Sequence, residues 1–329
     1  MFNPLMRFFM VLISVLSLSC ILLSQAHAGT TAVAWMDNTP GNLEIYCAVT
    51  PDTGAIWTIK RLTSNAGISA QPSVAVSGSN IHVAWMDNTP GNFEIYYAVS
   101  PDNGATWTKK RLTNNAGDSG VPSIAVSGSN VHIVWRDSTP GNFEIYYALS
   151  PDNGATWTKK RLSNNSGASY TPSIAVSGPD IHVVWGDSTS GNSEIYYAVS
   201  HDSGGTWTEQ RLSNNAGNSG NPGIDASGPD IHVAWDDNTP GIEEIYYAVS
   251  HDNGASWTEN RLTNNAGASK HPLIDASGPD IHIAWDDKTP GIEEIYYAVS
   301  HDNGAAWTVK RLTNNAGSSY GPSISTGTP

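Results

Sequence analysis

The chain has few charged residues and almost no cysteine. Asp, Glu, Lys and Arg make up 14% of its 329 residues, against about 25% in an average soluble protein. Basic residues are the scarcer kind, at 16 against 30 acidic ones, so the net charge is −14. This balance argues against non-specific binding of nucleic acid or of anionic membranes. Few Lys, Arg and Glu beside 31 Gly favour strands and turns over helices.

The N-terminus has no charge except Arg7 before Asp37, and residues 8–23 form an apolar run that ends before Ala26-His27-Ala28. This pattern predicts a secretory signal peptide over residues 1–28, cleaved after Ala28. A retained membrane anchor and a lipoprotein signal at Cys20 are the alternatives. Cleavage leaves Cys47 alone in a secreted chain of residues 29–329, at the cell surface or in a periplasm, without membrane insertion and without an intrachain disulfide.

Twelve tryptophans recur in two series with a spacing of 50 residues. The first series is Trp35, Trp85, Trp135, Trp185, Trp235 and Trp285, and the second is Trp57, Trp107, Trp157, Trp207, Trp257 and Trp307. A strict period of this size indicates a solenoid, a propeller or an array. The 301 residues after the signal peptide hold six such units, so the sequence predicts one domain over residues 29–329.

Each unit reads as four short strands separated by Gly, Pro, Asn and Asp turns. In the second unit they cover 73–76, 81–85, 94–100 and 107–113. Four antiparallel strands per repeat predict an all-β, six-bladed β-propeller of four-stranded blades. The chain starts at a second strand, 31–37, and ends on a copy of the first, 322–325. We therefore expect the C-terminal strand to pair into the first blade and close the ring.

One motif in every unit, Ser/Thr-x-Asp-x-Gly-x-x-Trp, resembles the Asp-box or BNR repeat of sialidases. Its Asp and Trp residues are Asp52 and Trp57, Asp102 and Trp107, Asp152 and Trp157, Asp202 and Trp207, Asp252 and Trp257, and Asp302 and Trp307. The resemblance implies a sialidase-like propeller whose boxes lie on the face opposite the active site. The residue types favour a structural role, since Asp can bond the N–H groups of its own turn and Trp can pack on the sheet.

A second repeated set consists of an acid that opens the third strand and an Arg near the end of the fourth, such as Glu94 and Arg111. Antiparallel pairing brings these two together, so we expect one structural Glu–Arg pair in each blade, with Asp87 and its counterparts as further members. His82 and its counterparts are expected to be packed histidines rather than metal ligands.

The repeats differ mainly in two loops that a propeller places on one face, and a binding site is expected there. Residues 31–180 carry 11 acidic and 9 basic residues, whereas 181–329 carry 19 and 6. Neutral drift in solvated loops is the alternative explanation of these differences. The candidate ligand-binding residues are Arg136, Tyr170, Asp225, Asp236, Glu243, Lys270, His271, Asp275, Asp286 and Tyr320.

Asp225 and Asp275 replace Ala on the innermost strand, which makes a calcium site conceivable. A solvated acidic face explains them without a metal, and no cofactor is expected.

Sialidase catalysis requires three converging Arg residues, yet every Arg after Arg7 except Arg136 belongs to the outer-strand repeat. The Arg-Ile-Pro motif of that family is absent, and no catalytic residue can be assigned. The sequence therefore favours a monomeric, non-catalytic module that binds a glycan or an extracellular protein. An exo-α-sialidase or related glycoside hydrolase is the alternative, and a structural surface scaffold is the second.

Overall fold

The structure, a computed structural model, describes residues 22–25, 30–51, 54 and 56–324. Most of the predicted signal peptide, its cleavage site, Asp52 and Ser325 lie outside these residues, and the side chains of 22–25 are not described. In the described part the regular elements are all strands, arranged as six four-stranded antiparallel sheets. No helix of that part is long and apolar enough to cross a membrane.

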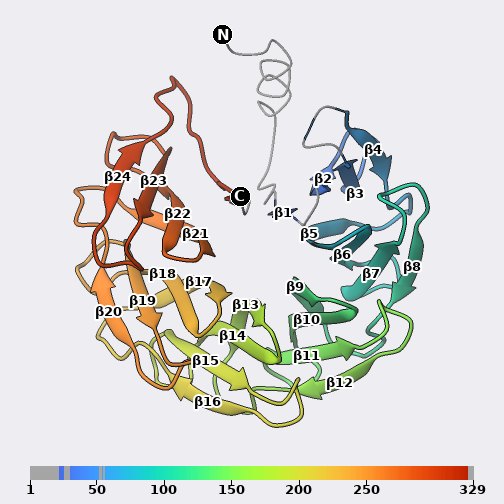
Figure 1. The fold of residues 1–329 in the computed structure, drawn as a ribbon, viewed down its shortest axis with the longest axis horizontal. Helices are drawn as coiled ribbons and strands as arrows, with labels where there is room; N and C mark the ends of the chain where they lie inside the picture. The colour runs from blue at the N-terminus through green and yellow to red at the C-terminus, as the bar shows by residue number, and fades with distance from the viewer. Residues whose placement is uncertain (1–21, 26–29, 52–53, 55, 325–329) are drawn as a thin grey trace.

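The strands fall into four classes by their position in a blade (Figure 1). The innermost are β1 (Leu22–Gln25), β5 (Ser69–Ser77), β9 (Ser119–Ser127), β13 (Ser169–Ser177), β17 (Ser219–Ser227) and β21 (Ser269–Ser277). The second strands are β2 (Thr31–Asp37), β6 (Asn80–Asp87), β10 (Asn130–Asp137), β14 (Asp180–Asp187), β18 (Asp230–Asp237) and β22 (Asp280–Asp287). The third are β3 (Glu44–Thr50), β7 (Glu94–Ser100), β11 (Glu144–Ser150), β15 (Glu194–Ser200), β19 (Glu244–Ser250) and β23 (Glu294–Ser300). The outermost are β4 (Thr58–Arg61), β8 (Thr108–Arg111), β12 (Thr158–Arg161), β16 (Thr208–Arg211), β20 (Thr258–Arg261) and β24 (Thr308–Arg311).

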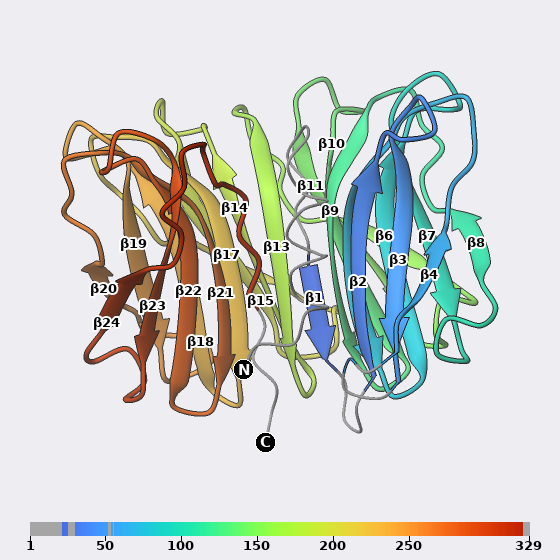
Figure 2. The same cartoon turned by 90° about the horizontal axis from the view of Figure 1, so that it is seen from above.

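The six sheets stand around a common axis as the blades of a β-propeller, which confirms the predicted fold class (Figure 1). Seen from the side, the strands run between two faces of a disc (Figure 2). We call the face with the turns 88–93 and loops 112–118, and their counterparts, the mouth face. The face with the turns 101–107 and their counterparts is the box face.

Apolar clusters fill the space between successive blades. One cluster joins Trp85 and Ile81 of the second blade to Ile45 of the first, and equivalent clusters link the later blades. The second and third strands supply most of these side chains because both of their faces are covered by neighbouring sheets. This repeated core makes the blades a rigid support for the loops at either face.

The predicted closing strand is wrong in one respect. The innermost position of the first blade is occupied by β1, which pairs antiparallel with β2, and residues 319–324 form no strand. Figure 1 shows the C-terminal segment running inward between the first and sixth blades. The physical reason is that the exposed backbone groups of an edge strand pair with any extended segment, and here β1 supplies that segment.

Candidate functional site

The two variable loops meet on the mouth face, as the repeat pattern predicts. The Asn88 amide donates to the Ile68 carbonyl at 3.1 Å, and the Ser69 amide donates to the Leu43 carbonyl at 2.9 Å. These bonds tie the loop that enters a blade to the turns of two adjacent blades. The loop positions are therefore fixed by the backbone, while their side chains differ from blade to blade.

Two variable positions face each other in the second to sixth blades, where the inner strand opposes the end of the second strand. The register pairs Ala70 with Met86, Gly120 with Arg136, Tyr170 with Gly186, Gly220 with Asp236, and Lys270 with Asp286. In the first four of these blades a small residue faces a large or charged one. In the fourth blade the two positions compensate in size, because the Tyr170 ring occupies the space that a Cβ at residue 186 would need.

Arg136 in the third blade is held by its own blade. Its guanidinium carbon lies 4.5 Å from the centre of the Phe143 ring, a cation–π arrangement. The Nε atom is buried without a hydrogen-bond partner. Burial lowers the pKa of Arg136, and the nearby Asp118 carboxylate partly offsets this effect. Arg136 is therefore a poor candidate for binding a substrate carboxylate.

Tyr170 in the fourth blade also packs within its blade. Its hydroxyl donates to the Ser193 hydroxyl, and its ring covers Gly186, where an added Cβ would lie 2.7 Å from the ring. Glycine is required there by this close approach. The ring is half-buried and only its remaining surface is available for stacking, whereas Tyr320, at the equivalent place after the sixth blade, is 50% exposed.

A continuous polar network joins the fifth and sixth blades at the mouth. Asp236 Oδ2 accepts from Asn221 Nδ2 at 3.0 Å and from the His271 amide at 3.0 Å. The His271 imidazole pairs through Nδ1 with Asp286 Oδ2 at 2.7 Å. The Gly321 amide donates to Asp286 Oδ1 at 2.9 Å. Each carboxylate thus links the inner strand of its own blade to the next segment around the ring.

The network sets the charge states of its members. Burial raises the pKa of Asp236, and the amide of His271 partly opposes this shift. The hydrogen bond that His271 makes to Asp286 raises the pKa of His271 above its ordinary value despite burial. The His271 side chain is 53% exposed while Asp286 is 8% exposed. An imidazole with a buried carboxylate behind it therefore faces solvent at the mouth.

A β-bulge in five inner strands positions these side chains. The residue before the strand proline has a left-handed backbone in each case: Gln71, Val121, Thr171, Asn221 and His271, with φ between 48° and 54°. The pairing register shifts at the same point. Left-handed backbone is uncommon outside Gly, especially for β-branched residues, and such strain concentrates at functional sites. The sequence shows the proline and the variable neighbour but not this conformation.

Two lysines of the mouth face have acidic partners. Lys270 Nζ lies 2.9 Å from Glu243 Oε1 across the fifth and sixth blades, and Lys288 Nζ lies 3.4 Å from Glu293 Oε1. Glu243 thereby joins the mouth network through Lys270. The candidate ligand residues of the fifth and sixth blades form one connected patch, apart from the two innermost aspartates.

Asp225 and Asp275 lie apart from the mouth, further along the inner strands, where the register pairs them with His232 and His282. Asp225 accepts the amides of Ala226 at 2.8 Å and of Ala276, in the next blade, at 2.7 Å. Burial, followed by the charge of Asp275, raises the pKa of Asp225 to about 7. No group of three or more His, Cys, Asp or Glu side chains suited to a metal occurs among the described residues.

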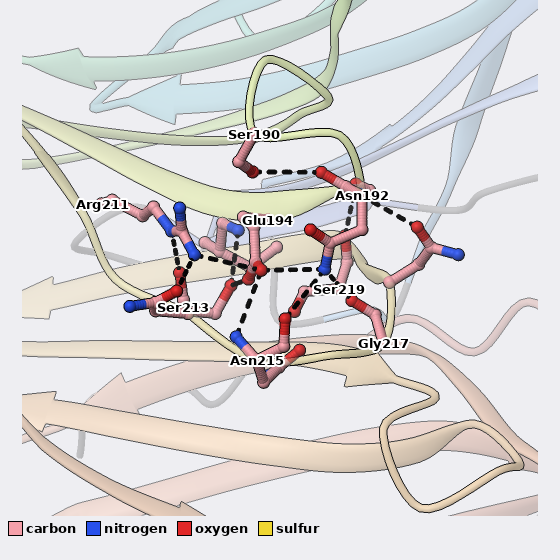
Figure 3. A network of polar contacts seen from close by, with 12 residues as sticks. Ser190, Asn192, Glu194, Arg211, Ser213, Asn215, Gly217 and Ser219 are labelled. Atoms are coloured by element: carbon pink, nitrogen blue, oxygen red, sulfur yellow. Dashed lines mark hydrogen bonds and ion pairs between the residues drawn. The ribbon is translucent and has the colours of Figure 1, made fainter.

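The repeated Glu–Arg pairs lie at the outer rim of the mouth face, in every blade. Figure 3 shows the pair of the fourth blade: Glu194 accepts from Arg211 Nη2 at 3.3 Å and from Ser213 Oγ at 2.5 Å. The counterparts of Asp87 do not join these pairs. Asp237 instead accepts from Asn215 Nδ2 at 2.6 Å and from Ser219 Oγ at 2.6 Å, which ties it to the preceding loop.

The Asp-box side chains bond their own turns on the box face. Asp102 Oδ1 accepts from the Thr106 amide at 2.8 Å, and Trp107 Nε1 donates to the Gly104 carbonyl at 3.0 Å. The same bonds recur around Asp152, Asp202 and Asp252. These internal bonds occupy the carboxylates and favour a structural role.

Three His–Asp pairs on the box face were not anticipated from the sequence. His201 pairs with Asp180 at 2.9 Å, and His251 with Asp230 and His301 with Asp280 each pair at 2.7 Å. The sequence contains a sign of these pairs: in the last three repeats His replaces the Pro of earlier repeats, and Asp replaces an Asn in the same repeats. Asp230 and Asp280 thus account for two of the acidic residues of 181–329 without a ligand.

Comparison with known proteins places the chain in a family. A model described as the BNR repeat-like domain matches residues 19–183. No curated protein matches the sequence. Among solved structures, a Hadza microbial sialidase superposes with a TM-score of 0.58 at 15% identity, covering 82% of this chain and 63% of that one. An α-L-arabinofuranosidase of Fusarium graminearum gives 0.60 at 13%, covering 85% and 92%. An ulvan lyase, a polysaccharide lyase, gives 0.63 at 13%, covering 90% and 84%.

These similarities differ in what they establish. The chain spans less than two thirds of the sialidases, 63% of the Hadza enzyme and 54% of one from Trypanosoma rangeli. At identities of 15% or less the structural likeness establishes the fold and not the activity. The family model covers just over half of the chain, so the chain belongs to the BNR repeat-like family. Its fold is a sialidase-like six-bladed propeller.

Proposed function

We propose that this protein is a secreted, monomeric and non-catalytic propeller that binds a neutral glycan through the mouth face of its fifth and sixth blades. The observation that carries the proposal is the network of Asn221, Asp236, His271 and Asp286, which presents a half-exposed imidazole on the face where the repeats differ. Carboxylate, amide and imidazole groups bind sugar hydroxyls, which both donate and accept. Fixed polar groups on a rigid scaffold suit such a ligand, since little ordering is required on binding.

The charge arrangement supports a neutral rather than an anionic sugar. Lys270 and Lys288 already have carboxylate partners, and Arg136 is partly buried over Phe143. An anion at the mouth would have to displace one of these partners while lying near Asp236 and Asp286. Exposed Tyr320 offers an aromatic surface at the same mouth for a sugar ring.

A sialidase or related glycoside hydrolase is the second candidate, favoured by the fold of the solved relatives. Sialidase chemistry departs from the paired carboxylates of most glycosidases. Arg136 is the residue that would bind the substrate carboxylate in such a site, but its guanidinium group stacks on the Phe143 ring. A fluorogenic sialoside separates the two candidates. The proposal predicts no turnover, and turnover that Arg136→Ala abolishes would overturn it.

A glycan array with the processed chain tests the binding role. Neutral glycans are expected to bind, and the signal is expected to fall in His271→Ala. The matched control is His201→Ala, because His201 is also 53% exposed and paired with an aspartate, yet lies on the box face. Absence of any binding together with absence of turnover would favour a structural scaffold and overturn the proposal.

A further inference from the structure

The outermost strands of the second and third blades carry most of the basic residues in the first half of the repeat array. Every basic residue of 31–180 except Arg136 lies on β4, β8 or β12. The strands β8 and β12, which belong to adjacent blades (Figure 1), both read Thr-Lys-Lys-Arg. Although the net charge of the chain is −14, its outer rim therefore has a basic strip, formed by Lys109, Lys110, Lys159 and Lys160.

Two lysines of the basic strip cross the groove between the second and third blades from opposite sides. Lys110 Nζ of β8 donates to the Ala155 carbonyl of the third blade at 3.1 Å. Lys159 Nζ of β12 donates to the Leu112 carbonyl of the second blade. Burial lowers the pKa of Lys159, the charge of Glu94 opposes this shift, and the charge of Lys110 adds to it. The two ammonium groups thus repel each other across the groove.

The positive charge of the basic strip is not neutralised by ion pairs. Within the described residues no carboxylate pairs with its lysines, whereas Lys270 and Lys288 at the mouth each have a partner. Glu94 and Asp137, whose charges act on Lys159, are buried and bonded to other donors. A carbonyl occupies one N–H of an ammonium group and leaves its charge and its other donors available. Bound anions would relieve the repulsion between the lysines.

A cavity of about 320 Å³ opens beside Lys159, between the second and third blades. This volume is within the range of small-ligand sites. Besides the lysine, its lining includes Thr113, Asn114, Thr139 and Tyr146. The half-buried Tyr146 ring stacks on Trp135 with ring centres 5.8 Å apart. Hydroxyl, amide, aromatic and ammonium groups together suit a sugar that carries an acidic substituent.

The later blades keep the aromatic pair of this groove but not its positive charge. Trp235 stacks on Tyr246 with ring centres 5.9 Å apart. The strands β16 and β20 read Thr-Glu-Gln-Arg and Thr-Glu-Asn-Arg, so Glu209 and Glu259 stand where Lys159 stands in the third blade. Gln210, at the position of Lys110, still donates to the next blade, to the Gly254 carbonyl at 2.6 Å. The contact between blades therefore does not require the charge of a lysine.

We propose that the groove between the second and third blades binds an acidic polysaccharide, whose carboxylate or sulfate groups lie at Lys159 and at Lys110. The adjoining sugar ring contacts Tyr146 in the cavity. Lys109 and Lys160, on the same two strands, extend the basic strip toward further acidic sugars of the chain. This site lies on the outer rim of the second and third blades and does not rest on glycan binding at the mouth.

Isothermal titration of the processed chain with two acidic probes tests the site. The probes are hexagalacturonate, which carries carboxylates, and a sulfated galactan oligosaccharide, and the tighter one identifies the acidic group. Lys110→Gln and Lys159→Gln should each weaken binding at least about tenfold, because each removes charge-assisted hydrogen bonds. The matched control is Lys310→Gln, which makes the same change on β24, at the position that Lys110 has on β8.

The titration overturns the proposal if neither probe binds, or if Lys310→Gln weakens binding as much as the two groove variants. Equal affinity for a single-stranded DNA oligonucleotide would also overturn it, since this would show attraction to any polyanion. His271→Ala should bind the acidic probes as the wild type does. A loss in that variant would place the acidic sugar at the mouth and overturn the proposal.

Lysine modification gives a second readout that needs no variant. The processed chain is acetylated with an amine-reactive ester, with and without the tighter probe, and the modified positions are quantified by mass spectrometry. The probe should slow the modification of Lys110 and Lys159 but not that of Lys310. Protection of Lys270 alone, or equal protection of all lysines, would overturn the proposal.

Discussion

Substitution of Glu194 tests whether the repeated Glu–Arg pairs stabilise the fold or take part in binding or catalysis. Its carboxylate is fully buried and has four donors. Arg211 and Ser213 bond it, and so do Asn192 Nδ2 at 2.9 Å and the Asn215 amide at 3.2 Å (Figure 3). Replacing it with alanine removes the acceptor that all four donors share.

The expected cost follows from these contacts. Removing one partner of a buried ion pair costs about 3–5 kcal/mol. The Arg211 side chain is 28% exposed and can be hydrated after the change, so the lower value of about 3 kcal/mol applies. In a domain of this size each kcal/mol lowers the Tm by roughly 2–4 °C. Glu194→Ala is therefore expected to lower the Tm by about 6–12 °C.

Differential scanning calorimetry of the processed chain measures this change. Glu194→Gln keeps an acceptor oxygen and should lie between the wild type and the alanine variant. Glu209→Gln is the control, because burial and the charges of Asp187 and Glu144 raise the pKa of Glu209, which means that folding destabilises its ionised form. That variant should melt at or above the wild-type temperature. A Glu194→Ala protein that melts within about 1 °C of the wild type would refute the structural role.

Three further predictions concern the mouth, the inner strands and the box. Asp286→Asn should lower the pKa of His271 in an NMR titration, because the carboxylate raises it. The stability from this pair should be present below pH 6.5 and be lost as the pH rises through the folded pKa. Asp225, whose pKa is raised to about 7 by burial and then by Asp275, costs stability as it ionises. The Tm of Asp225→Asn minus the Tm of the wild type should therefore be larger at pH 8 than at pH 5. An equal difference at the two pH values would contradict this. Gly204→Ala, at φ +93° and against Tyr147, should cost at least about 2 kcal/mol in urea unfolding.

The fold was predictable because the sequence repeats it six times. Strand positions, turns and the Glu94–Arg111 pair follow from a period of 50 residues with few departures. Closure was not predictable in the same way. The repeat pattern points to 322–325 as the inner strand of the first blade, whereas β1, which lies outside the repeats, pairs with β2.

The candidate site was predictable as a face but not as a set of contacts. Arg136 and Phe143 are seven residues apart, and their stacking is visible only in the three-dimensional arrangement of β10 and the turn before β11. The left-handed backbone of His271 arises at a bulge before proline, which no local preference of histidine indicates. The separation of Asp225 from Asp236 likewise depends on where each residue lies along its strand.

The central claim is that a glycan binds at the mouth of the fifth and sixth blades. The most direct measurement is isothermal titration of a neutral glycan identified on the array into the wild type, His271→Ala and His201→Ala. The account predicts at least about tenfold weaker binding for His271→Ala, a loss of about 1.4 kcal/mol, and an unchanged Kd for His201→Ala. Equal affinities in all three proteins, or a loss confined to His201→Ala, would contradict it.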